Sequence, residues 1–170
     1  MIIDKVCGID NGFSGFMVFL NCKTKEIVQM LSYPKQNPIE LFKIFETYRP
    51  KHVVLEQPFI TMGFKGVSSS NYEILGRYSQ TLEYLNISYN TVRVQEWRKF
   101  LNIKAKGREA NKQASIEKCK ELFNEDNFRF FYSKKGSIVN HKRVEVKYID
   151  DNKCESALIA YYAAQKYLEE

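Results

Sequence analysis

Four acidic residues in this 170-residue chain have the type and spacing of metal ligands. Asp10 follows the apolar run KVCGI, and Glu56 ends the apolar run HVVLE. Asp151 and Glu155 are four residues apart in a predicted C-terminal helix, which places them about 40° apart on one face. Strands that end on a carboxylate, below a helix that carries two more, predict a cluster of acids.

Such a cluster needs cations. Carboxylates brought together repel one another and are stable only when protonated or filled by cations. All-oxygen ligands suit Mg²⁺ or Mn²⁺. Two such ions, about 3.5–4 Å apart, activate a water and stabilise the leaving oxygen in phosphodiester cleavage. The acids together therefore indicate a two-metal nuclease site.

Each acid also has a structural interpretation. Asp-Asn-Gly is good turn chemistry, so Asp10 is a candidate for the start of a β-hairpin turn. Against this, Gly12 and Gly15 would let a phosphate backbone approach the main chain. Taken alone, Glu56 is a strand-end surface charge, and Asp151 with Glu155 are first-turn acids favoured by the helix dipole.

The charge of the chain points to an acidic partner. The net charge is +6 and the isoelectric point is near 9.0, which favours nucleic acid. From Arg98 to Lys147 there are fourteen Lys and Arg against six Asp and Glu, so this segment is +8 and the remainder −2. The basic surface is therefore local, and it lies between acidic stretches.

Composition predicts one globular domain over residues 1–170, with a basic insert at about 124–148. The sequence has no long apolar run and no signal-peptide pattern. Its four cysteines are scattered, as expected for reduced thiols in an intracellular protein. We therefore expect no membrane association and a location in the cytoplasm of a bacterium or a phage-infected host.

The periodicity predicts an α/β fold with an antiparallel N-terminal part. Gly76, inside a predicted helix, costs roughly 1 kcal/mol against Ala, which suggests a close helix contact. The predicted strands are 2–9, 14–21, 26–32, 52–58 and 87–94, with a basic hairpin within 124–148. The predicted helices start at Asn37 and at the capping box of Ser70, and cover 95–102, 110–123 and 150–169.

The order of the motifs resembles the RuvC-type Holliday junction resolvases of the RNase H-like superfamily. The motifs are G-I-D-x-G-x-x-G (8–15), V-V-L-E-Q-P-F (53–59) and D-N-K-C-E-S-A-L-I-A (151–160). Ser-Ser-x-x-x-x-Leu-Gly-Arg (69–77) also matches, and W-R-K before a Lys-x-x-Ser helix resembles the bacteriophage-type branch. The resemblance implies an RNase H-like mixed sheet, antiparallel strands first and parallel strands after, flanked by helices.

The resemblance assigns roles to the acids. It implies that Asp10 is shared by both metals, that Glu56 binds metal at its strand end, and that Glu155 is the last ligand. Asp151 matches a helical acid that the better-known bacterial branch carries one position later, where this chain has Asn152.

Asp150 therefore stays a candidate ligand, although its angle of about 140° from Glu155 favours a cap. The resemblance also implies nucleic-acid contacts. Phe59 matches an aromatic that stacks into the opened junction, or it is a packing residue of the loop. The expected phosphate contacts are Lys65, Arg77, Arg98, Lys99 and Lys112. The basic insert has no counterpart, so it either binds flanking duplex phosphates or is a solvated hairpin.

The implied protein is a crossover junction endodeoxyribonuclease of DNA recombination and repair. It would cut four-way junctions and other branched DNA in pairs, with two Mg²⁺ per site and Mn²⁺ as a substitute. Junction symmetry implies a homodimer, with the helix from Ser70 as candidate interface. The alternatives are an RNase H-like nuclease on RNA–DNA hybrid and a non-catalytic nucleic-acid-binding relative. A further alternative, an actin-like or sugar-kinase-like ATPase, is disfavoured because 170 residues do not supply the second lobe that closes over the nucleotide in those folds.

Overall fold

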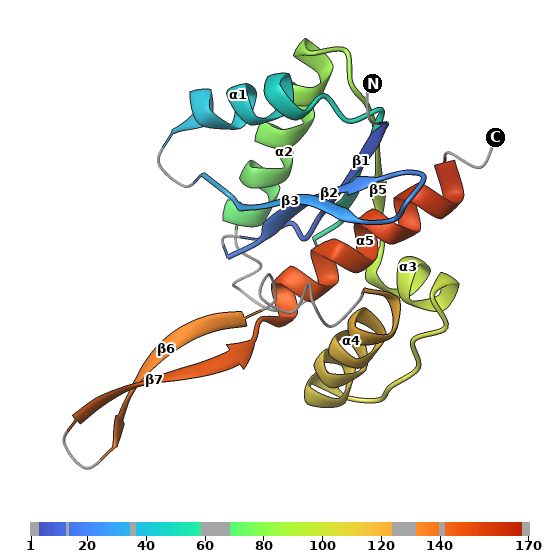
Figure 1. Ribbon diagram of the computed structural model, residues 1–170. Helices are drawn as coiled ribbons and strands as arrows, with labels where there is room; N and C mark the ends of the chain where they lie inside the picture. Colours follow the sequence, from blue (N-terminus) through green and yellow to red (C-terminus); the bar gives the residue numbers. More distant parts are fainter. Residues whose placement is uncertain are drawn as a thin grey trace.

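A five-stranded sheet with helices on both faces forms the body of the protein, and a two-stranded hairpin extends from it (Figure 1). The computed structural model describes residues 4–12, 14–34, 37–58, 69–123, 132–139 and 142–167. The elements are, in order, β1 (Lys5–Ile9), β2 (Phe16–Asn21), β3 (Ile27–Ser32), α1 (Pro38–Tyr48), β4 (His52–Glu56), α2 (Ser69–Tyr84), β5 (Ser88–Val92), α3 (Val94–Phe100), α4 (Arg108–Leu122), β6 (Tyr132–Val139), β7 (Lys142–Ile149) and α5 (Asp151–Tyr167).

The sheet has the predicted mixed character. Its strand order is β3-β2-β1-β4-β5, with β1, β2 and β3 antiparallel and β1, β4 and β5 parallel. In the β1–β4 pair, Ile9 lies opposite Leu55. Asp10 and Glu56, the next residues along β1 and β4, therefore lie side by side at the same edge of the sheet.

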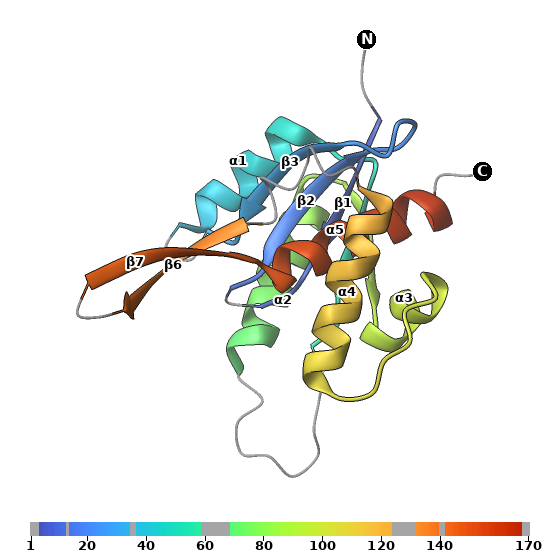
Figure 2. The same ribbon diagram turned by 60° about the horizontal axis from the view of Figure 1, so that its bottom comes forward.

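The alternation of side chains sorts the strands between two cores. Val6 and Val54 pack with α3, α4 and α5, whereas Cys7, Ile9 and Leu55 pack with α1 and α2. Figure 2 shows α5 and α4 on one side of the sheet and α1 on the other. Continuing the alternation by one position places Asp10 and Glu56 on the α5 face.

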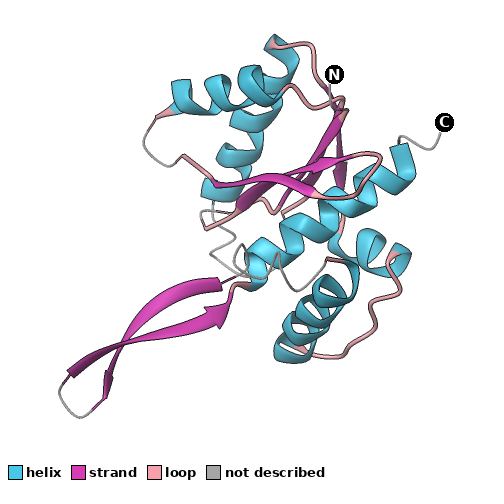
Figure 3. Ribbon diagram, viewed as in Figure 1, coloured by secondary structure: helices cyan, strands magenta, loops and turns pink. Residues whose placement is uncertain are grey.

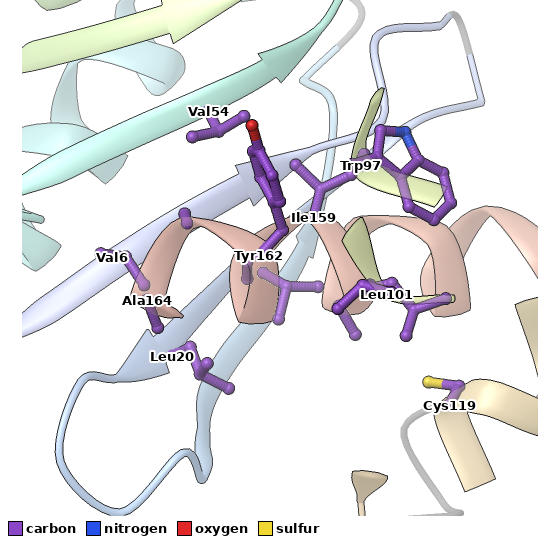
Figure 4. Close-up of a cluster of buried hydrophobic side chains, with 14 of the residues drawn as sticks. Val6, Leu20, Val54, Trp97, Leu101, Cys119, Ile159, Tyr162 and Ala164 are labelled. Atoms are coloured by element: carbon purple, nitrogen blue, oxygen red, sulfur yellow. The ribbon is translucent and has the colours of Figure 1, made fainter. Parts of the chain in front are cut away.

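The core on the α5 face joins three helices to the sheet. Figure 4 shows the side chains that meet there, among them Val6, Leu20, Val54, Trp97, Leu101, Cys119, Ile159, Tyr162 and Ala164. Trp97 is fully buried, so α3 is held against α5 by a large apolar contact. This contact matters because α3 and α5 both carry polar residues to the site described below.

Gly8 lets α5 cross β1 at very short range. A Cβ at Gly8 would lie 2.0 Å from the backbone nitrogen of Ala160 and 2.5 Å from the carbonyl oxygen of Ser156. Real Cβ atoms do not approach backbone so closely, so no other residue fits without moving the helix. Gly8 therefore sets how close the helical acids lie to Asp10.

Local signals place most boundaries well. Asn37 caps α1 as predicted, because its side chain accepts the Ile39 N–H at 3.1 Å. The strand predicted over 87–94 ends earlier, because extended Arg93 is the cap of α3. The helix predicted to begin at Ser70 starts at Ser69, and Glu73 pairs with Arg77.

Gly76 is a correction. A Cβ there would meet nothing within 4 Å, so the helix contact predicted from this glycine is absent from the described chain. Nothing inside the single chain therefore requires glycine at this position of α2.

The predicted basic hairpin consists of β6 and β7, an antiparallel pair in register from Tyr132 opposite Ile149 to Val139 opposite Lys142. It projects away from the body as a separate two-stranded sheet (Figure 3). Among the described helices, none combines the length and the apolar character needed to span a lipid bilayer.

Candidate active site

Asp10 lies in the loop that joins β1 to β2. The Gly12 N–H bonds to the Asp10 carbonyl at 3.1 Å, and the Gly15 N–H bonds to the Gly12 carbonyl at 2.8 Å. A Cβ at Gly15 would lie 1.9 Å from the Asp10 carbonyl oxygen, so the turn requires glycine there. The turn and the acidic site are therefore compatible: the turn holds the Asp10 backbone while its side chain enters the cluster.

Hydrogen bonds tie the start of α5 to this loop. The Asp10 N–H donates to the Ser156 hydroxyl at 3.3 Å, and this hydroxyl donates to the Phe16 carbonyl at 3.0 Å. The Asn152 side chain donates to the Ser14 carbonyl at 3.3 Å. Because these contacts and the Gly8 crossing fix the helix, its first-turn acids lie over the end of β1.

Asp150 acts as the cap of α5. Its Oδ1 accepts the Asn152 N–H at 3.1 Å, and its carbonyl accepts the Cys154 N–H at 3.1 Å. The structure therefore shows the helix cap that the sequence favoured for Asp150.

The acids interact strongly. Burial raises the pKa of Asp10 well above its ordinary value, and the charges of Glu56, Glu155 and Asp151 raise it further, with Asp150 contributing least. Burial and the charge of Glu155 raise the pKa of Glu56 to about 7, against the lowering effects of the Trp97 hydrogen bond and the Arg98 charge. The fold thus brings the four predicted acids into one electrostatic cluster.

Basic and polar side chains of α3 and α4 balance the cluster. Trp97 Nε1 donates to Glu56 Oε2 at 2.8 Å. Arg98 forms an ion pair with Glu155, which also accepts from Ser115 Oγ at 3.1 Å. Lys112 Nζ lies 2.7 Å from Asp151 Oδ2.

The four carboxylates suit a divalent cation by their chemistry, although their side chains are not arranged around a single metal position. Among the residues that the structure describes, no group of three or more Asp, Glu, His or Cys side chains is arranged to hold a metal ion. The fit lies in the chemistry: buried carboxylates whose mutual repulsion raises the pKa of Asp10 are the groups that a cation relieves. Binding an ion shared by three acids therefore requires side-chain movement.

The predicted phosphate contacts fall into different settings. Arg98 is turned inward, with its side chain 12% exposed, and Lys112 pairs with an acid of the cluster. Arg77 is bound to Glu73 and lies 3.4 Å from the Tyr33 hydroxyl. Phe59 and Lys65 lie outside the described residues.

Lys99 is exposed beside an open cleft of about 670 Å³. The cleft lies where β4 and β5 end, next to the position of Glu56. Its lining consists of Gln57, Pro58, Arg93, Val94, Gln95, Glu96 and Lys99. Arg93 and Lys99 give this cleft an exposed basic surface beside the end of the strand that carries Glu56.

Three residues of the site were given no role by sequence reasoning. Ser115 and Ser156 are fully buried polar residues, and Trp97 is fully buried. All three lie within the quoted motifs W-R-K, Lys-x-x-Ser and D-N-K-C-E-S-A-L-I-A, which are the signal that could have found them.

Comparison with known proteins gives structural matches only. No protein-family model matches the chain, and no curated protein sequence matches it. The RuvC of Thermus thermophilus in complex with a Holliday junction has a TM-score of 0.58 at 10% identity, over 96% of each chain. The fowlpox virus Holliday junction resolvase has a TM-score of 0.55 at 13% identity, over 97% of this chain and 98% of that one.

The yeast mitochondrial Holliday junction resolvase Ydc2 gives 0.51 at 16% identity, over 98% of this chain and 82% of that one. These matches show the fold: the chain has the RNase H-like architecture of the RuvC-type resolvases. The resemblance seen in the sequence motifs is thereby confirmed at the level of the fold.

Proposed function

We propose that this protein is a divalent-metal-dependent endonuclease that resolves Holliday junctions and other branched DNA by paired cleavage. The observation that carries the proposal is the cluster of Asp10, Glu56, Asp151 and Glu155 at one edge of a sheet with the resolvase architecture. The structurally similar proteins include Holliday junction resolvases, two of which have been solved in complex with a junction.

The acids would hold the metal, proposed to be two Mg²⁺ with Mn²⁺ as a substitute. When bound, divalent cations supply an activated water for attack and stabilise the departing 3′ oxygen of the phosphodiester. The charges of the other acids all raise the pKa of Asp10, which supports its proposed role as the ligand shared by both ions. Lys112 stands beside Asp151, where it would neutralise the phosphate that enters.

DNA would reach the acids across the basic surfaces. Lys99 and Arg93 line the cleft next to Glu56, and the β6–β7 hairpin, which leads into α5, carries further basic residues in its sequence. Two symmetric nicks in one junction require two active sites, which a two-fold dimer would supply. Exposed Tyr72 and Tyr84, with open space at Gly76, favour α2 as the dimer surface.

Cleavage of a synthetic four-way junction tests the proposal. With Mg²⁺, wild-type protein should give two symmetric nicks with 5′-phosphate ends. Asp10→Asn should cut at least about a hundredfold more slowly, because it removes the acid that both ions share. Junction binding by the variant should persist in gel shifts without metal.

Two outcomes contradict the proposal. Binding without cleavage by the wild type in both Mg²⁺ and Mn²⁺ would indicate a binding module. Cleavage of an RNA–DNA duplex in place of the junction would indicate an RNase H-like enzyme.

A further inference from the structure

Three of the acids share one pattern: a donor contacts one carboxylate oxygen, and the other oxygen is left without a hydrogen bond from the described residues. Trp97 binds Oε2 of Glu56, and Lys112 binds Oδ2 of Asp151. Both donors to Glu155, Arg98 and Ser115, bind Oε1. No hydrogen bond from the described part of the chain reaches the second oxygen of any of the three.

The donors to Glu56 and Glu155 are held rigidly. Trp97 and Ser115 are fully buried, and Arg98 is nearly so. The Arg98 guanidinium also lies 5.2 Å from the centre of the Trp97 ring, a cation–π contact that restrains both side chains. Burial and this contact restrain the three donors in the metal-free structure.

The placement of α3 explains how neighbouring residues serve two acids. Successive residues on a helix project about 100° apart, so Trp97 and Arg98 face different neighbours. Trp97 reaches the end of β4, and Arg98 reaches α5 and the Ser115 hydroxyl of α4. One short helix thus connects both acids, which come from distant parts of the chain.

We propose that Trp97, Arg98 and Ser115 are positioning residues that orient Glu56 and Glu155 so that one oxygen of each faces a divalent cation. Outer partners of this kind fix the orientation of metal-binding carboxylates, and their loss typically costs about 10–100-fold in metal affinity. This inference rests on the proposed function. It also replaces the phosphate contact expected of Arg98 with a role inside the protein.

Titration with Mn²⁺ alone, followed by calorimetry in the absence of DNA, tests the inference. Trp97→Phe removes the donor without changing the charge but leaves a cavity in the core, and Ser115→Ala removes one hydroxyl. Each should weaken Mn²⁺ binding about 10-fold or more. The thermal midpoint of each variant in EDTA is measured alongside, so that a folding defect is recognised.

Tyr162→Phe is the matched control. It removes a hydroxyl that contacts Glu96 at 3.0 Å, an acid of the same helix α3 but outside the cluster. Its Mn²⁺ affinity should equal that of the wild type even if its thermal midpoint falls. An equal loss of affinity in this control would overturn the inference, since general loosening of α3 would then explain all three results.

If Trp97→Phe and Ser115→Ala bind Mn²⁺ as tightly as the wild type, the positioning role is also overturned. If Trp97→Phe does not fold, Ser115→Ala alone decides. Arg98→Met should weaken Mn²⁺ binding and leave the salt dependence of junction binding in EDTA unchanged. Tighter Mn²⁺ binding would show that the guanidinium competes with the cation, and a slope lower by about one would show a phosphate contact. Either result would overturn the role given to Arg98.

The two proposals fail separately. A wild type that binds Mn²⁺ and cuts junctions, with variants of unchanged affinity, removes the positioning role alone. A wild type that binds the junction but no Mn²⁺ removes the metal-dependent nuclease together with the inference that depends on it.

Discussion

Glu56 is a buried carboxyl whose charge lowers the stability of the metal-free protein. Its pKa is raised from 4.5 to about 7, so between these values the folded state binds more protons than the unfolded state. Stability therefore falls as the pH rises through this window, by up to about 3 kcal/mol in total. Below pH 4.5 this loss of stability from ionised Glu56 is absent, and above pH 7 it is fully present.

We expect Glu56→Gln to unfold at higher urea than the wild type at pH 8 in EDTA, by about 2 kcal/mol, and to match it near pH 4.5. The amide keeps an acceptor for Trp97 and carries no charge. Mg²⁺ should stabilise the wild type and not the variant. Glu83→Gln, on the exposed face of α2, is the control and should show no such pH-dependent gain; equal gains in the two variants would contradict the assignment.

Individual residues also show what sequence reasoning can and cannot supply. Asp10 and Glu56 were found because strand endings carry local signals, and two neighbouring parallel strands bring their ends together. The contacts of Ser115 and Arg98 with Glu155 were not predicted, because this partner belongs to α5, 40 and 57 residues away. Only the packing of the helices decides which way such side chains point.

At the scale of the elements, the crossing of β1 and α5 positions the acids. Gly8→Ala should destabilise the protein by about 2 kcal/mol or more, because the added methyl group meets backbone atoms of α5 that cannot rotate away. It should also abolish cleavage by displacing Asp151 and Glu155. Urea unfolding and the junction assay measure the two effects.

Gly76→Ala is the matched control for this change. The added methyl group meets nothing within 4 Å in α2, and alanine is favoured over glycine in a helix by about 1 kcal/mol. This variant should therefore be as stable as the wild type or more so. If Gly8→Ala proved equally harmless, the close crossing would not be what positions α5.

The sequence predicted the helices α5 and α2, but the helix contact that it predicted from Gly76 is wrong. A glycine in a helix has the same local pattern whether it faces another backbone or open space. For Gly8 the apolar run around it indicated only a strand, although the motif G-I-D marked the position. Close approach is a property of two elements, so single-element patterns do not reveal it.

For the molecule as a whole, the β6–β7 hairpin decides how far the DNA-binding surface extends. The predicted hairpin is present because its alternating pattern is local, although the turn expected at Lys-Gly-Ser (135–137) is wrong: these residues pair with β7 inside β6. The charge pattern of the hairpin left two uses open. The register places Lys134 opposite Lys147. Both residues are basic, so we choose this pair to test whether the hairpin contacts phosphate.

A double variant distinguishes a hairpin that binds DNA phosphates from one that is merely solvated. Lys134→Gln with Lys147→Gln should lower the slope of log affinity against log salt by about 2 for a four-way junction in EDTA, since each phosphate contact contributes about 0.9. Lys23→Gln with Lys43→Gln, both exposed on the body, removes the same two charges and should leave the slope nearly unchanged. Because the net charge of the two variants is equal, a difference between them reports contact and not overall attraction. Equal slopes in both would mean that the hairpin is solvated and that the junction is held by the body alone.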